Sequence, residues 1–334
     1  MKLSIVIPYY NSNAWIGETL ESLLDQGFSH EEYEIIVVDD ASDEEPVVLN
    51  NYVASYPCIH YYNQGKLGMS GARNFGISVA KGDWVFFCDS DDYLQRKVLL
   101  RIIDAAEQLD LDVIFANFTE ITPNKRPCDP KRDFSSLSEA VSGVEYYSKP
   151  HDPLAIAVWC YIVKRELIIA NDLRFRDVYC AEERHFYQDL LFCASRVAHI
   201  DVDMYYYVRR EDSVSRGKKR LRCSEYMSYL YGYIYRLSED MNNGCYDSQV
   251  VERMKYHMGR CSFILLHNVF RYCPVKETTD YLARLTELEA YPIIHYSATR
   301  ESWTLVLKWI NIKWLWVLGC RLYHIVPLPI RVRF

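Results

Sequence analysis

The fold is decided between Gly68 and Leu94, where the sequence reads GMSGARNFGISVAKGDWVFFCDSDDYL. The helical period of Ser70 to Lys81 predicts a helix that ends at Gly82. Trp84 to Cys88 (WVFFC) follows as a strand that is apolar on both faces. Such strands are typical of a parallel sheet that is covered by helices on both sides. The stretch therefore predicts an α/β fold in which acidic residues, Asp89 to Asp92, follow a buried strand.

The same alternation continues on both sides of this stretch. Further buried strands are predicted at Leu3 to Pro8, Glu34 to Asp39, Ile59 to Asn63 and Asp112 to Phe118. Helices are predicted at Trp15 to Leu24, in a segment ending near Tyr56, and at Val98 to Leu109. We expect an open α/β sandwich with a mostly parallel central sheet.

The later part of the chain has a different character. Pro123 to Pro153 is rich in Pro, Lys, Asp and Ser and predicts a loop or an excursion from the sheet. Residues from about 155 to 215 predict a mixture of short strands and helices. From Ser224 to Leu288 the apolar residues recur at helical spacings, which predicts a helical C-terminal extension.

Polar and acidic side chains follow three of the predicted strands. They belong to Pro8-Tyr9-Tyr10-Asn11, Asp39-Asp40 and Asp89-Ser90-Asp91-Asp92. Ligands of open α/β sheets bind beyond the carboxyl ends of the strands, so these groups predict a binding site. The sequence has neither G-x-G-x-x-G after the first strand nor G-x-x-x-x-G-K-[ST], which disfavours a Rossmann site and a P-loop.

The acidic segment after WVFFC has two interpretations. Carboxylates one residue apart, at Asp89 and Asp91, can hold a hard divalent cation that makes a diphosphate a better leaving group. Alternatively, the segment is a solvated turn in which Asp91 or Asp92 caps the next helix.

The composition excludes several classes of protein. A formal charge of −7 on 334 residues argues against a protein that coats nucleic acid. The 11 cysteines lie singly, which is typical of reduced thiols in the cytosol. The N-terminus does not resemble a signal peptide, and no run of about eighteen apolar residues occurs, so we expect no membrane-spanning helix.

Four segments resemble the successive motifs of family 2 glycosyltransferases. They are SIVIPYYN (Ser4 to Asn11), VVDDASD (Val37 to Asp43), the opening stretch and YQDLLF (Tyr187 to Phe192). Members are inverting enzymes with the GT-A fold that use nucleotide-sugar donors. The resemblance is dense over residues 3–120 and thinner over 155–215. It implies a nucleotide-sugar-binding catalytic domain at 1–220 and a helical region at 221–334.

The resemblance implies a role for each matching residue of the donor site. Pro8 and Tyr10 would cradle uracil, and Asp39 and Asp40 would accept a hydrogen bond from the base, which favours a UDP-sugar. Arg73 would face the donor phosphate or ribose. Asp89 and Asp91 match the D-x-D pair, with Asp89 reaching ribose or metal and Asp91 binding Mn²⁺ or Mg²⁺. The alternative for Tyr10 is packing, and for Arg73 a surface ion pair.

An inverting transfer also needs a base that takes the proton of the acceptor hydroxyl. The register of the family motif gives Gln188-Asp189-Leu190-Leu191-Phe192, which makes Asp189 the expected base. Gln188 departs from the usual Glu, so the help of that acid would come from the amide or from nearby Glu182 or Glu183. The alternative is that Asp189 caps a helix.

Three further residues are candidates for contact with the acceptor or the donor diphosphate. Met204 to Arg216 resembles the family's aromatic strand and the polar loop that closes over the diphosphate. Arg209 and Arg210 stand where many relatives have His, and arginine pairs with phosphate but does not ligate a metal. Trp159 lies where relatives place an aromatic near sugar or acceptor, and it fits a core position equally well. The histidines lack zinc-site spacing.

The tail from Arg300 to Phe334 contains four tryptophans and six basic residues against one acid, a local charge of +5. Aromatic and basic side chains together suit an anionic bilayer surface; the alternative is a helix packed on the protein's own core. Membrane contact would suit a lipid-linked acceptor at the cytoplasmic face of the inner membrane.

We therefore expect a metal-dependent hexosyl- or N-acetylhexosaminyltransferase of bacterial surface polysaccharide synthesis, acting on a lipid-linked or oligosaccharide acceptor. The family's processive members carry Q-x-x-R-W, which is absent, so single-sugar addition is predicted. A sugar nucleotidyltransferase is the first alternative, although the glycine-rich basic loop of such enzymes is missing. A non-catalytic membrane scaffold is the second, against which the D-x-D pair and Asp189 argue.

Overall fold

The computed structural model describes residues 1–123, 132–149, 156–177, 183–210, 224–244, 246–296, 301–313 and 316–318. The chain divides into two compact units. The first comprises Met1–Asp177 and Ala181–Ser213, and the second comprises Val178–Cys180 and Val214–Phe334.

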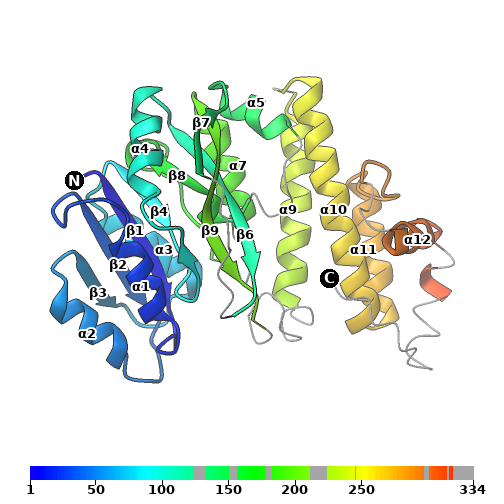
Figure 1. The fold of residues 1–334 in the computed structure, drawn as a ribbon. Helices are drawn as coiled ribbons and strands as arrows, with labels where there is room; N and C mark the ends of the chain where they lie inside the picture. The colour runs from blue at the N-terminus through cyan, green and yellow to red at the C-terminus, as the bar shows by residue number, and fades with distance from the viewer. Residues whose placement is uncertain are drawn as a thin grey trace. The chain divides into compact units, whose positions relative to one another are not determined.

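The first unit is built on one mixed sheet (Figure 1). Its strands are β1 (Leu3–Tyr9), β2 (Tyr33–Asp39), β3 (Ile59–Asn63), β4 (Trp84–Phe87), β5 (Tyr93–Leu94), β6 (Val113–Ile121), β7 (Arg132–Leu137), β8 (Tyr161–Lys164) and β9 (Val197–Val208). The strand order is β3-β2-β1-β4-β8-β6-β9-β5, and β7 also pairs with β9. The first four strands in this order are parallel, whereas β8 runs antiparallel to both β4 and β6. The predicted α/β class with a central sheet is confirmed.

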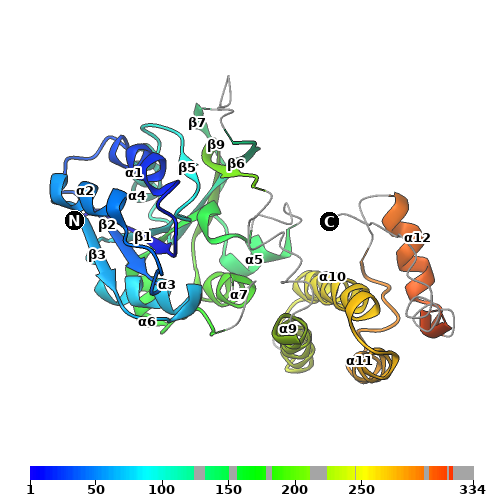
Figure 2. The same ribbon diagram turned by 90° about the horizontal axis from the view of Figure 1, so that it is seen from below.

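Helices cover both faces of the sheet. They are α1 (Ile16–Leu24), α2 (Val47–Ser55), α3 (Gly68–Val79), α4 (Leu99–Gln108), α5 (Gly143–Ser148), α6 (Arg165–Ala170) and α7 (Glu183–Cys193). Figure 2 shows α1 and α4 on one face and α3 and α6 on the other. This two-sided cover explains why every residue of β2 and β4 is buried.

Close packing of α3 on β1 depends on Gly76. A Cβ added to Gly76 would lie 2.2 Å from Cγ1 of Val6, so only glycine lets the helix backbone approach the strand this closely. Arg73 lies one turn earlier on α3 and is fully buried. The close approach of helix and strand therefore brings a buried guanidinium to the sheet.

The parallel register brings three strand ends to one edge. Tyr9 is paired with Asp39, Asp39 with Asn63, and Val6 with Phe87. The residues that follow β1, β2 and β4 therefore leave the sheet on the same side, as predicted from the sequence.

One predicted loop is wrong. Within Pro123 to Pro153 the structure contains β7 and α5, and β7 pairs with β9. The polar composition of β7 reflects the exposure of most of its described side chains, which removes the apolar alternation by which a strand is recognised.

The second unit is helical, as predicted. Its helices are α9 (Ser224–Asn242), α10 (Ser248–Tyr272), α11 (Val275–Glu287) and α12 (Glu301–Ile310). Asp247 caps α10 by accepting hydrogen bonds from the backbone N–H groups of Gln249 and Val250. Within the ranges described, no helix is long and apolar enough to cross a membrane.

Part of the basic, tryptophan-rich tail packs on this unit. The ring centroids of Trp309 and Trp316 lie 5.3 and 4.6 Å from that of Phe270 in α10, and Trp316 is fully buried. These two tryptophans therefore follow the core alternative. The side chain of Trp303, and Trp314, lie outside the described residues.

Candidate functional site

The loop after β1 is tied to the segment after β2. The Tyr10 hydroxyl donates a hydrogen bond to Oδ2 of Asp43 over 2.8 Å, and Oδ1 of Asn11 accepts from the backbone N–H of Asp43 over 2.9 Å. Tyr10 keeps 48% of its surface exposed. Pro8 lies in β1 beside Val38. The predicted uracil-binding residues thus stand at the carboxyl edge, with an open aromatic ring.

Asp39 and Asp40 are adjacent but have different surroundings. Asp39 is buried, and its oxygens accept hydrogen bonds from the N–H and hydroxyl of Ser42 and from the hydroxyl of Tyr61. Asp40 is partly exposed, and its Oδ1 accepts from the backbone N–H groups of Leu67 and Gly68 at the start of α3. Asp39 therefore holds the loop together, whereas Asp40 is the one that can reach a ligand.

Arg73 joins the end of β4 to the start of α7. Its Nη2 lies 3.1 Å from Oδ1 of Asp89 and 3.5 Å from Oε1 of Glu183, and its guanidinium carbon is 5.4 Å from the ring centroid of Phe175. Asp89 and Glu183 keep 30% and 22% of their side chains exposed, so both partners of the buried cation reach solvent. Arg73 thus makes an ion pair, but its guanidinium is buried and does not form the surface ion pair that was its alternative role.

The next acids of the motif face the end of β9. Oδ2 of Asp91 lies 2.9 Å from Nη1 of Arg210. Burial and the charge of Asp89 raise the pKa of Asp91 to about 6, although Arg210 opposes the shift. Asp92 is buried and accepts hydrogen bonds from the Tyr205 hydroxyl and the Val208 N–H. Burial, followed by the charges of Asp91 and Asp89, raises the pKa of Asp92 well above its usual value.

Tyr205 connects two of these acids and was not predicted as a site residue. Its hydroxyl donates to Asp92 and accepts from the backbone N–H of Asp89 over 3.1 Å. Trp159 stacks on Tyr205, with ring centroids 4.7 Å apart and an angle of 4° between the planes, and it is buried. Trp159 therefore occupies a core position, which was the alternative to a contact with sugar or acceptor. It is linked to the acidic segment through Tyr205. A tyrosine within an aromatic strand gives no sequence signal for this role.

The two arginines that were predicted to contact the acceptor or the diphosphate pair with different acidic residues. Arg210 pairs with Asp91, whereas Arg209 pairs with Glu120 of the neighbouring strand β6. The part of the predicted closing loop that follows, from residue 211 onward, lies outside the described residues.

Two acidic residues of α7 are candidates for the catalytic base that takes the proton of the acceptor hydroxyl. Glu183, in the first turn, is in ion-pair distance of Arg73. Asp189 follows six residues later, about 9 Å further along the helix axis and on another face. Burial raises the pKa of the Cys193 thiol, one turn further on, and the charge of Asp189 adds to this increase. The structure thus links Glu183, through Arg73, to Asp89, and Glu182 lies outside the described residues.

The donor atoms at this edge suit a hard divalent cation. Asp89 and Asp91 supply carboxylate oxygens, which hard cations prefer as ligands. The negative charges of the two carboxylates repel each other, and a divalent cation bound to both would relieve this repulsion. No group of three or more His, Cys, Asp or Glu side chains that could hold a metal occurs within the described part of the chain. The two aspartates therefore fit a metal that takes its other ligands from a phosphate and water.

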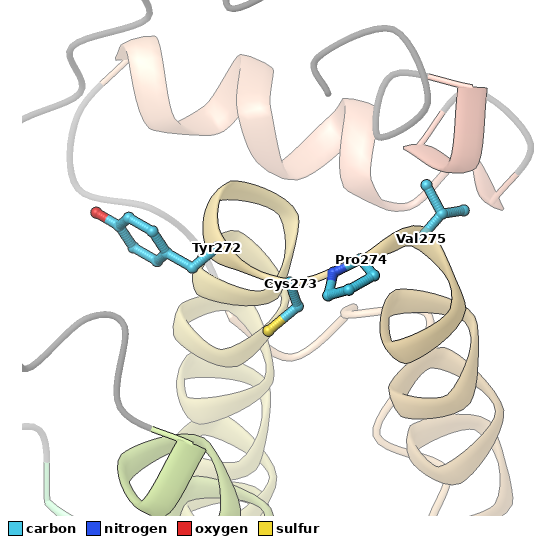
Figure 3. A pocket seen from close by; sticks show the side chains of 4 residues that line it. All are labelled: Tyr272, Cys273, Pro274 and Val275. Atoms are coloured by element: carbon cyan, nitrogen blue, oxygen red, sulfur yellow. The ribbon is translucent and has the colours of Figure 1, made fainter. Parts of the chain in front are cut away.

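A surface hollow in the second unit is unrelated to this site. It is lined by Tyr272, Cys273, Pro274 and Val275, where α10 turns into α11 (Figure 3). None of these four described side chains carries a charge that could hold a diphosphate, and none was predicted as a site residue.

Comparison with known proteins finds similarity to glycosyltransferases. Residues 4–169 match the family model of Glycosyl transferase family 2. The chain is 29% identical over 233 residues to the uncharacterized glycosyltransferase EpsJ of Bacillus subtilis, which covers 69% of this chain and 67% of that protein. It is 34% identical over 218 residues to the poly(ribitol-phosphate) beta-glucosyltransferase of Bacillus spizizenii, which covers 63% of this chain but 33% of the relative.

Solved structures share the fold. The crystal structure of Staphylococcus aureus TarS 1–349 in complex with UDP-GlcNAc aligns with a TM-score of 0.60 at 19% identity, covering 87% of this chain and 89% of that one. The mannosyltransferase PcManGT of Pyrobaculum calidifontis, in complex with GDP-Man and Mn²⁺, aligns with a TM-score of 0.52 at 15% identity, covering 98% of this chain and 87% of that one.

Proposed function

This chain belongs to glycosyl transferase family 2, and we propose that it transfers one sugar from a UDP-sugar to an acceptor hydroxyl with inversion at the anomeric carbon. One observation carries the proposal, namely the cluster of charged side chains at one edge of the sheet. Arg73 pairs with Asp89 and Glu183, and Arg210 pairs with Asp91. Asp40 and Tyr10 follow strands that end at the same edge. We assign the reaction to the first unit, which contains all these residues.

The uracil of the donor would bind at the ends of β1 and β2. Asp40 offers a partly exposed carboxylate that can accept the N–H of uracil, and the exposed ring of Tyr10 offers a stacking surface. Asp39 and Asn11 would hold the two loops at fixed distance without touching the base. That TarS, of the same fold, is known in complex with UDP-GlcNAc supports a UDP-sugar.

Asp89 and Asp91 would hold Mn²⁺ or Mg²⁺ against the donor diphosphate. When bound, this ion would neutralise the charge that develops on the departing UDP. Tyr205 would keep the two aspartates in place, because its hydroxyl binds both the backbone of Asp89 and the carboxylate of Asp92.

Glu183 is the base that the geometry favours, with Asp189 as the competing candidate. Oε1 of Glu183 lies 3.5 Å from Nη2 of Arg73, and a carboxylate at this position could receive the proton of the acceptor hydroxyl. Arg73 also contacts Asp89, so the base and the donor end of the site would be held by one rigid side chain.

A panel of nucleotide-sugars tests the proposed donor. We expect UDP-hexoses or UDP-N-acetylhexosamines, with Mn²⁺ present, to raise the melting temperature, because a ligand that binds only the folded state stabilises it. GDP-sugars are expected to have a much smaller effect, since a purine does not fit a site that reads uracil. Stabilisation by a GDP-sugar alone would contradict the assignment.

We also propose that the acceptor is a lipid-linked or oligosaccharide precursor of a bacterial surface polysaccharide, used at the cytoplasmic face of the inner membrane. The beta-glucosyltransferase relative acts on poly(ribitol-phosphate), which supports a polymeric surface acceptor. Leu305 of α12 and Ile312 just beyond it are exposed, beside the exposed Lys308 and Lys313. Apolar and basic side chains together suit an anionic bilayer surface.

We expect the protein to float with vesicles containing anionic lipid. The partition coefficient of the variant Leu305→Ser/Ile312→Ser between vesicles and water is expected to be lower by about tenfold or more. Each apolar side chain contributes up to about 1.5–3 kcal/mol when it leaves water, and each nearby basic residue adds about 1 kcal/mol at an anionic surface. Ile294→Ser is the matched control, because Ile294 is exposed in the same unit but precedes α12. Equal flotation of both variants with wild type would refute membrane contact through this segment.

A further inference from the structure

Arg210 neutralises the very carboxylate to which the proposed function gives a metal. Its Nη1 lies 2.9 Å from Oδ2 of Asp91 and 4.0 Å from Oδ1 of Asp92. The guanidinium carbon is 5.0 Å from the ring centroid of Trp15, and only 9% of the Arg210 side chain is exposed. Trp15 and the two aspartates thus enclose the cation from different elements, which makes it a built contact and not a chance surface pair.

A guanidinium and a divalent cation cannot both take the same position on Asp91. Arginine donates hydrogen bonds and carries a permanent charge, so it does not ligate a metal and repels one nearby. Oδ2 of Asp91 accepts a hydrogen bond from Nη1 of Arg210. A metal that binds through Oδ2 of Asp91 therefore requires that this contact be broken.

We propose that Arg210 is an internal counter-cation of Asp91 that exchanges with the divalent metal when the donor binds. The released guanidinium then pairs with phosphate oxygens of the donor, for which its forked donors are suited. This inference rests on the proposed function of the site. It adds a charge exchange that keeps Asp91 paired in the absence of donor and makes metal alone a weak ligand.

The neighbouring arginine gives a matched control. Arg209 pairs with Glu120, whereas Arg210 pairs with Asp91, so removal of Arg209 deletes the same charge one residue away without opening the metal position. A general effect of charge on metal binding would appear in both variants, whereas an exchange at Asp91 appears only when Arg210 is changed.

The experiment measures binding of Mn²⁺ alone to the full chain, from the signal of free Mn²⁺ in electron paramagnetic resonance. We expect Arg210→Ala to bind Mn²⁺ about tenfold more tightly than wild type, and Arg210→Lys and Arg209→Ala to stay within about twofold. For Mn²⁺ together with UDP the order reverses, because Arg210→Ala has lost its partner for the diphosphate. Equal or weaker Mn²⁺ binding by Arg210→Ala, or an equal gain in Arg209→Ala, would overturn the exchange.

Trp15→Leu provides a second route to the same result. It removes the ring on which the guanidinium rests and leaves Arg210 and Asp91 unchanged, so Mn²⁺ alone should again bind more tightly. If Arg210→Ala does not fold, as judged by its melting curve, this variant decides, and unchanged Mn²⁺ binding by it overturns the proposal. UDP binding by wild type in the presence of Mn²⁺ tests the proposed function separately, because it does not depend on the comparison among arginine variants.

Discussion

Glu183→Gln is expected to lower the rate of sugar transfer by about 10²–10⁴-fold, which corresponds to roughly 2.7–5.4 kcal/mol of transition-state stabilisation. The amide keeps the volume of the side chain and an oxygen that can accept from Arg73, but it cannot take the acceptor proton. UDP affinity should change little, because the base serves the acceptor and not the diphosphate. Initial rates of transfer and UDP titrations on the same preparation measure both quantities.

Asp189→Asn is the matched comparison on the same helix. If Glu183 is the base, this variant should transfer sugar at close to the wild-type rate, since it keeps the carboxylate that takes the proton. A severe loss in Asp189→Asn together with an active Glu183→Gln would reverse the assignment and make Asp189 the base. Losses in both would require melting curves to separate catalysis from folding.

Asp91→Asn is expected to remove the contribution of Mn²⁺ to UDP binding. Changes in groups that merely orient metal ligands cost about 10–100-fold in metal affinity, so loss of an anionic ligand should lower UDP affinity in the presence of Mn²⁺ by about 100-fold or more. With a chelator present, the variant and wild type should bind UDP equally weakly. Calorimetric titration of UDP under the two conditions gives all four values.

Asp83→Asn serves as the control for this experiment. Asp83 is exposed and precedes β4, whereas Asp91 lies beyond the other end of the same strand. Both variants lose one negative charge, but only one loses it at the proposed metal position. A similar loss of UDP affinity in both, or a Mn²⁺ effect that survives in Asp91→Asn, would remove Asp91 from the metal site.

The first half of the fold could be predicted closely because three of its strands, β1, β2 and β4, are buried almost throughout. Ile59–Asn63 is the observed β3, and the predicted strand from Glu34 to Asp39 differs from β2 by one residue. The partly exposed strand β7 lies in a stretch that was predicted to be a loop, because pairing with β9 depends on a distant segment that local composition does not reveal.

The site could be predicted as a group of residues but not as a division of roles. Asp39 and Asp40 are neighbours with the same chemistry, and only the contacts of Asp39 with Ser42 and Tyr61 reveal that one of them is internal. The spacing of an acid three residues before Phe occurs twice in α7, at Glu183 with Phe186 and at Asp189 with Phe192. Sequence spacing cannot choose between the two, whereas the position of Arg73 on α3 favours the first.

The most direct test of the account is the stereochemistry of sugar released from a UDP-sugar. Proton NMR of the wild-type protein with Mg²⁺ and the α-linked UDP-hexose or UDP-N-acetylhexosamine that binds best follows the anomer that appears first. A single displacement assisted by Glu183 predicts the β-anomer with equimolar UDP, and a strongly reduced rate in Glu183→Gln. Initial release of the α-anomer, or an unchanged rate in Glu183→Gln, would contradict it.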